Sequence, residues 1–150
     1  MALATIEIIR NGNINKIFDD ANIKSALELA IKITTEAKSL APVAEKHGGR
    51  LRNSIMYKTN KEIGGFNDSS GENSQAKINV NPKEAEAFVG FNLLYGIYQE
   101  YGTRKMAPQP FFRPAIAIWS GQKAVDVIKK IHDEELRGKL KEGQMRETFF

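Results

Sequence analysis

The segment EYGTRKMAPQPFFRPAI, residues 100–116, lies between two predicted helices and combines three prolines and two phenylalanines with basic residues. Before it, residues 94–102 suit one or two packed helical turns, which Gly102 is placed to end. After it, Pro114 suits the first turn of a long helix over residues 114–143, because a proline there sacrifices no hydrogen bond. The buried stripe expected for that helix consists of Ile118, Gly121, Val125, Ile128 and Ile131.

Upstream of this segment, the chain predicts a short strand and then a long helix. β-branched residues over 3–11 indicate the strand. Apolar residues recur every three or four positions from Ile14 to Leu40, which predicts an amphipathic helix. Pro42 disfavours helical backbone at the residue before it, so the helix should end near Leu40. Residues 51–58 indicate a helical turn that continues as a strand.

The middle of the chain predicts an antiparallel sheet. Residues 76–80 (AKINV) and 86–91 (EAFVGF) have strand character, with a turn between them. Residues 61–75 are rich in Gly, Asn and Ser, which indicates a long mobile loop. The order of elements therefore predicts an α+β fold in which a small antiparallel sheet packs against a long N-terminal helix and a long C-terminal helix.

The composition restricts the class of protein. A chain of 150 residues, 41% of them hydrophobic, suits a single domain. Residues 143–150 are expected to form a C-terminal tail, either extended or docked on a partner through Phe149 and Phe150. The chain has no cysteine, which excludes disulfides and thiolate metal sites. No apolar run approaches the roughly 20 residues of a membrane helix, so we expect no membrane partner.

The net charge of +4 is concentrated in one region of the chain. Residues 36–61 contain six Lys or Arg against two Asp or Glu, whereas residues 62–98 contain two against five. The candidate basic patch consists of Arg50, Arg52, Lys58 and Lys61. Such a patch can attract phosphate groups or an acidic protein surface, and a merely solvated surface is the alternative.

The sequence offers no pattern typical of catalysis or metal binding. His47 and His132 lack the spacing of metal ligands. Glu134 and Glu135 are neighbours on a predicted helix, so their side chains point in different directions and do not form an acid–base pair. We therefore expect no enzymatic activity, no cofactor and no metal.

The segment around residues 98–113 instead has the composition of a protein–protein contact. Tyr and Arg are enriched in binding hot spots, and prolines reduce the entropy lost when a loop is held in one shape. The candidate subunit interface consists of Tyr98, Glu100, Tyr101, Gly102, Thr103, Arg104, Lys105, Pro108, Gln109, Pro110, Phe111 and Arg113. In the alternative interpretation, Tyr98, Phe111 and Phe112 close the core beneath the helices.

Two blocks of the chain resemble a family of tail-completion and neck proteins of long-tailed double-stranded-DNA bacteriophages and prophages. Members carry a helix ending in Ala-Pro and then Gly-Arg-Leu-Arg-x-Ser-Ile, which LAPV…GRLRNSI (residues 40–55) matches. An aromatic-Glu-aromatic-Gly-Thr stretch then precedes Pro-x-Pro-Phe and Arg-Pro-Ala, as in YQEYGTRKMAPQPFFRPAI (residues 98–116). The family usually has Val-Asp-Thr-Gly-x-Leu after Ala-Pro, whereas this chain has the longer VAEKHGGRLRNS without an Asp-Thr pair.

The resemblance implies a structural virion protein that forms a ring, commonly sixfold, at the phage neck, where it joins the tail to the DNA-filled capsid. The implied partners are other copies of the chain, neighbouring neck and tail proteins, and genome DNA passing through the ring. The basic patch would then line the lumen or form a second interface. Assembly would take place in the cytoplasm of the bacterial host. Two alternatives stay open: a tail terminator that caps the tail tube, and a basic nucleic-acid-binding module.

Overall fold

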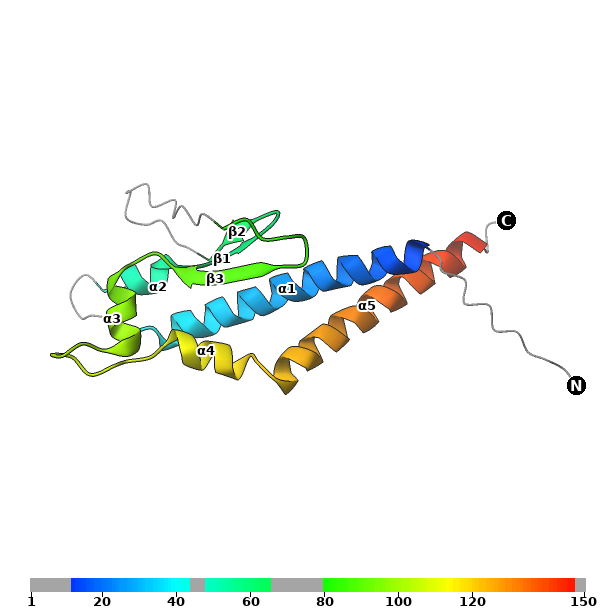
Figure 1. Ribbon diagram of the computed structural model, residues 1–150. Coiled ribbons are helices and arrows are strands. Elements are labelled where there is room, and N and C mark those ends of the chain that lie inside the picture. The colour runs from blue at the N-terminus through cyan, green and yellow to red at the C-terminus, as the bar shows by residue number, and fades with distance from the viewer. Residues whose placement is uncertain (1–11, 44–47, 66–79, 148–150) are drawn as a thin grey trace, which may run out of the picture.

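The two long helices of the chain are joined through a sheet and three short helices. The computed structural model describes residues 12–43, 48–65 and 80–147. The helices are α1 (Gly12–Leu40), α2 (Arg50–Ser54), α3 (Tyr95–Tyr101), α4 (Phe112–Ile118) and α5 (Gln122–Glu147), and the strands are β1 (Ile55–Thr59), β2 (Ile63–Gly64) and β3 (Ala87–Phe91). Figure 1 shows the sheet on one side of α1, with α4 and α5 on the other. The predicted α+β class, with two long helices and a small antiparallel sheet, is confirmed.

Helix α1 is the element on which the others pack. Its most buried positions carry small side chains, which let the sheet and α4 approach its backbone closely. These positions are Ala21, Ser25, Ala30, Thr34 and Ala37. The helix ends at Leu40, two residues before Pro42, as the sequence predicts.

The sheet has the order β2-β1-β3, and both pairings are antiparallel. Strand β1 follows α2 directly, as expected, and β3 coincides with the strand predicted over residues 86–91. The prediction that residues 61–75 form a loop is wrong at Ile63 and Gly64. These two residues pair with Lys58 and Tyr57 through a tight turn, in which the Thr59 N–H donates to the Glu62 carbonyl at 2.8 Å.

Several predicted segments lie partly or wholly outside the described residues. The strand predicted over 3–11 is one of these. So are residues 66–75 of the loop and residues 76–79 of the strand predicted over 76–80, whose last residue, Val80, is not in a strand. Strand β3 pairs with β1 in a register that joins Ile55 to Phe91.

The core lies where α1, α2, β3 and α4 meet. Its fully buried members include Leu51, Ile55 and Phe111, which pack with Ala37, Ala41 and Ala115. Phe91 packs against Phe111 and Phe112 with ring centroids 5.3 and 5.6 Å apart. Such aromatic pairs contribute beyond the area that they bury, so this cluster links β3 to the start of α4.

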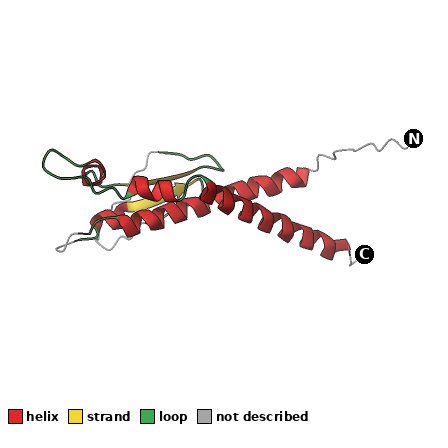
Figure 2. Ribbon diagram, turned by 90° about the horizontal axis from the view of Figure 1, so that it is seen from below, coloured by secondary structure: helices red, strands yellow, loops and turns green. Residues whose placement is uncertain are grey.

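The long helix predicted from Pro114 to residue 143 is interrupted. Helix α4 stops at Ile118, and α5 begins at Gln122 after Gly121, whose φ of +62° is left-handed. Gly121 and Val125 are exposed, which corrects the predicted stripe, while Ile118, Ile128 and Ile131 are half-buried. After the break, α5 bends away from the direction of α4 and runs beside α1, antiparallel to it (Figures 1 and 2).

The C-terminal tail predicted from residue 143 is also corrected. Helix α5 continues to Glu147, because the charged sequence after His132 contains no helix-breaking proline. Residues 149 and 150 lie outside the described part of the chain.

Candidate functional site

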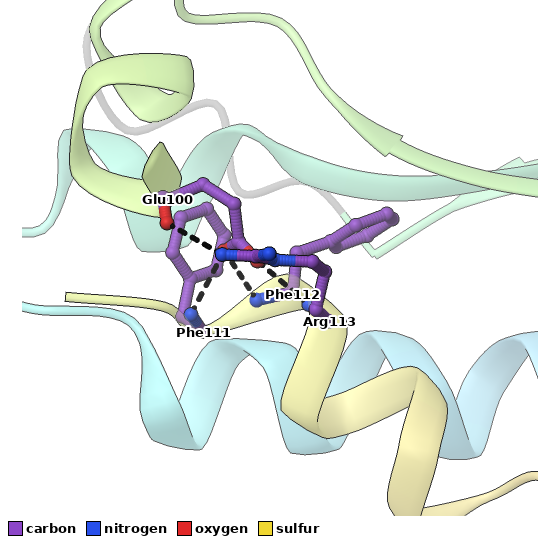
Figure 3. A network of polar contacts seen from close by, with 4 residues as sticks. All are labelled: Glu100, Phe111, Phe112 and Arg113. Carbon is purple, nitrogen blue, oxygen red and sulfur yellow. Dashed lines mark hydrogen bonds and ion pairs between the residues drawn. The ribbon is translucent and has the colours of Figure 1, made fainter. Parts of the chain in front are cut away.

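The Glu100 carboxylate closes the loop that connects α3 to α4 (Figure 3). Its Oε2 accepts hydrogen bonds from the backbone N–H groups of Phe111 and Phe112, both at 2.9 Å. Its Oε1 accepts the backbone N–H of Arg113 at 3.0 Å and the Arg113 Nε at 2.9 Å. The Arg113 Nη2 also donates to the Glu100 carbonyl at 3.1 Å. One buried side chain therefore caps the first turn of α4 and fixes both ends of the loop.

The environment of Glu100 favours its ionised form. The residue is only 3% exposed, and burial by itself would raise the pKa of its carboxyl group. The backbone N–H groups of Phe112, Phe111 and Arg113, together with the Arg113 side chain, outweigh burial and lower that pKa below its ordinary value. The carboxylate is thus a charged anchor at neutral pH.

Further backbone contacts hold the loop between Tyr101 and Pro110 in one shape. The Gly102 N–H donates to the Tyr98 carbonyl at 2.8 Å, and Gly102 has a left-handed φ of +76°, as its predicted role as a helix stop requires. The Thr103 N–H donates to the Met106 carbonyl at 2.9 Å, and the Gln109 N–H donates to the Gln99 carbonyl at 2.7 Å. The loop is a braced hairpin that projects from the end of the molecule (Figure 1).

Helix α3 presents an apolar and aromatic surface beside this loop. Five large side chains on α3 or directly before it are exposed, from 42% for Tyr95 to 69% for Leu94. We call this set the α3 surface; its members are Leu94, Tyr95, Ile97, Tyr98 and Tyr101. The Arg113 guanidinium lies 4.6 Å from the centre of the Tyr101 ring, which holds that ring in place. Exposed aromatic clusters of this kind mark binding surfaces.

The structure divides the predicted interface residues into buried and accessible ones. Glu100 and Phe111 are buried and make contacts within the chain, and Gly102 is half-buried. For Phe111, the alternative interpretation of a core residue therefore holds, and Phe112 is half-buried against that core. The exposed members of the set are Tyr98, Tyr101, Thr103, Arg104, Lys105, Pro108, Gln109, Pro110 and Arg113.

The four residues of the predicted basic patch do not lie together. Arg50 and Arg52 are exposed on α2, which contacts α3 through Leu51 and Gly96. Lys58 and Lys61 lie at the other end of β1, a strand that spans about 17 Å at ~3.3 Å per residue. Glu62, Glu84 and Glu86 line the same small pocket as Lys61, so that end of the strand carries acidic as well as basic groups. The basic end of the molecule is therefore α2 together with the loop bearing Arg104 and Lys105.

Other kinds of site find little support in the described part of the chain. It contains no group of three or more His, Cys, Asp or Glu side chains placed to hold a metal ion. His132 packs on Phe18 with ring centroids 5.8 Å apart, and its Nε2 lies 3.1 Å from the Asn22 Oδ1. None of the described helices is both long and apolar enough to cross a bilayer.

Two features of the site were not predicted from the sequence. Leu94 and Ile97 extend the exposed surface, and the sequence gives no local sign of this, because leucine and isoleucine side chains are most often buried. Gly96 lets α3 approach the core, since a Cβ there would lie 2.6 Å from the Phe91 ring and 2.9 Å from Leu51 Cδ1. A glycine inside a short helix gives no local sign of such a contact.

Comparison of this chain with protein-family models, curated proteins and solved structures finds no match.

Proposed function

We propose that this protein is a structural subunit that forms a ring at the neck or tail end of a long-tailed bacteriophage and joins the tail to the DNA-filled capsid. Its partners are other copies of itself, the neighbouring neck and tail proteins, and the DNA that passes through the ring. The protein performs no catalysis and acts within the virion after assembly in the host cytoplasm.

The observation that carries this proposal is the braced loop beside the α3 surface. A ring closes only if each subunit meets the next at a fixed angle, which requires a contact surface that does not bend. The buried Glu100 clamp and the backbone contacts of Gly102 and Gln109 supply that rigidity. The exposed tyrosines and Arg104 supply the residue types that dominate binding energy.

The resemblance to phage neck proteins coincides with this geometry. The residues that carry its second block, 98–116, are those that build the clamp, the loop and the start of α4. The first block, 40–55, supplies α2 and the beginning of β1, and its Leu51 lies at the contact with α3. Both blocks therefore encode one end of the molecule.

The proposal is tested in the producing phage or prophage. The gene is deleted, the lysogen is induced, and the lysate is imaged by electron microscopy. Filled heads separated from tails of normal length are the expected result. Overlong tails would instead favour a tail terminator. Intact infectious virions would overturn the structural role.

A nucleic-acid-binding module is the second candidate, favoured by the exposed Arg50, Arg52, Arg104 and Lys105 at one end of the molecule. That function requires the purified protein to bind DNA with an affinity that falls steeply as salt rises. Affinity that is absent at low salt would exclude it.

A further inference from the structure

A groove runs between α1 and α5, the two long helices, and is lined by residues from both. Its volume is about 590 Å³, within the range of about 300–1,000 Å³ typical of ligand sites. Leu27, Val127 and Ile131 form its apolar part, together with Trp119 from the junction of α4 and α5. Asp126 and Glu134 are exposed along it, and the Glu134 carboxylate lies 3.9 Å from the Lys130 Nζ. Lys24 and Lys32 also line the groove, where they pair with Glu135 and Glu28. We call it the interhelical groove.

Trp119 carries a polar group without a partner. Its indole Nε1 is buried and meets no hydrogen-bond acceptor among the described residues. Buried donors in folded proteins are almost always paired with a protein group or with water, so this indole N–H has capacity for an acceptor from outside the chain. The Lys32 and Lys123 ammonium groups lie over the indole, 5.0 and 5.7 Å from the ring centroid, and both side chains are long and flexible.

The braced loop has the complementary chemistry. Pro108 and Pro110 have no backbone N–H, and the Gln109 N–H between them already donates to Gln99, so the backbone of residues 108–110 offers carbonyl acceptors and no free N–H donor. Proline-rich segments of this kind dock in aromatic-lined grooves elsewhere in protein recognition. Arg104 and Lys105 precede the segment in the same loop, are exposed, and make no ion pair with a described residue.

The loop cannot reach the groove of its own chain. It projects from α3 at the end of the molecule that lies away from α5, as both views of the chain show (Figures 1 and 2). The loop also precedes α4, which separates it from Trp119 along the chain. A contact between the two surfaces therefore joins two copies.

We propose that the loop Gly102–Pro110 of one copy docks in the interhelical groove of the next. A carbonyl of residues 108–110 accepts the Trp119 N–H, the prolines cover the apolar part, and Asp126 and Glu134 face Arg104 and Lys105. This contact rests on the proposed function in one respect: a ring needs a second surface on each subunit that receives the loop of its neighbour. The two patches differ, so the contact is head-to-tail and generates a ring or a filament, not a symmetric dimer.

The test uses the absence of native cysteine, which makes every introduced thiol specific. A tagged Ala107→Cys protein is mixed with a Lys130→Cys protein and treated with a short bismaleimide. Ala107 is exposed in the loop and Lys130 at the groove rim. The matched control partner is Lys83→Cys, which is exposed at the turn before β3 and is not among the residues that line the groove. Heterodimers should form with Lys130→Cys and not with Lys83→Cys. Equal yield from the two partners, or none from either, overturns the proposal.

Charge reversal provides the second readout. Adding Arg104→Glu and Lys105→Glu to the loop protein should weaken the contact by about thirtyfold, the loss typical of a binding hot spot. Adding Asp126→Lys and Glu134→Lys to the groove protein should restore the cross-link. A loop that is merely misfolded would not be rescued by changes in its partner, so failure of rescue counts against the pairing.

This outcome is independent of the electron microscopy of the deleted phage. If the cross-link forms specifically but the phage with the deleted gene still yields intact virions, the proposed subunit contact stands and the neck function is refuted. If the deletion separates heads from tails but no cross-link forms, the neck function stands and the subunits must meet through another surface.

Discussion

Glu100→Gln is the change that tests most directly whether a buried carboxylate holds the loop in place. The substitution keeps the shape of the side chain and removes its charge. The carboxylate accepts four hydrogen bonds, and glutamine retains one acceptor oxygen, so two of the four are lost and an NH₂ group faces N–H donors instead. Hydrogen bonds to charged groups contribute about 1.5–3 kcal/mol each, so the loss of two predicts a fall of about 3–6 kcal/mol in the free energy of unfolding.

The loss is measured by urea denaturation followed by far-ultraviolet circular dichroism, and as a fall in melting temperature of about 10 °C for a chain of this size. Glu134→Gln is the matched control. Its carboxylate is exposed and lies 3.9 Å from the Lys130 Nζ, so its removal should change stability by no more than about 0.5 kcal/mol.

Arg113→Met separates the parts of the clamp. The Arg113 side chain is 56% exposed, and removing it leaves Glu100 with its three backbone donors. It should therefore destabilise the protein less than Glu100→Gln does. The reasoning is refuted if Glu100→Gln is as stable as Glu134→Gln, or if Arg113→Met proves to be the more harmful change.

Further predictions concern pH, the close contact of α3, and the division between core and surface. Because folding lowers the pKa of Glu100, the ionised carboxylate contributes its full stability above its ordinary pKa of 4.5, and this contribution is lost as pH falls through the pKa of the folded state. The difference in free energy of unfolding between wild type and Glu100→Gln, measured by urea titration, should therefore narrow as pH falls below 4.5. Gly96→Ala should lower the melting temperature, because its Cβ would press on the core, whereas Gly138→Ala, with open space on α5, should raise it slightly. Phe111→Ala should cost about 3–5 kcal/mol in a chemical denaturation experiment, because the ring is fully buried. Tyr101→Ala should leave the melting temperature within a few degrees of wild type and lower the yield of assembled particles, and an unchanged particle yield would count against the α3 surface as a contact.

Local sequence patterns determined much of the architecture. The apolar stripe and Pro42 give the extent of α1, Gly102 ends α3, and Pro114 lies in the first turn of α4. Each of these features depends on residues within a turn or two of one another, where backbone propensity and helical periodicity act directly. The helical turn and strand predicted over residues 51–58, which are α2 and β1, also depend on such local patterns.

Tertiary structure decided the features that depend on distant residues. Ile63 and Gly64 have no strand pattern of their own and become β2 only because β1 offers an edge to pair with. The break at Gly121 involves few residues, yet it bends the chain so that α5 runs beside α1, where contacts such as the Lys24–Glu135 ion pair stabilise it.

The role of Glu100 shows the same limit within the candidate site. A glutamate between two tyrosines, in a segment of basic and polar residues, has the appearance of a surface contact, and its residue type predicts exposure. Only the fold brings the N–H groups of residues 111–113 to its carboxylate, and those donors replace the water that an ionised group requires. The sequence by itself thus determined that residues 100–116 form a rigid connection between helices, whereas the tertiary structure decided which of those residues hold it together and which face outward.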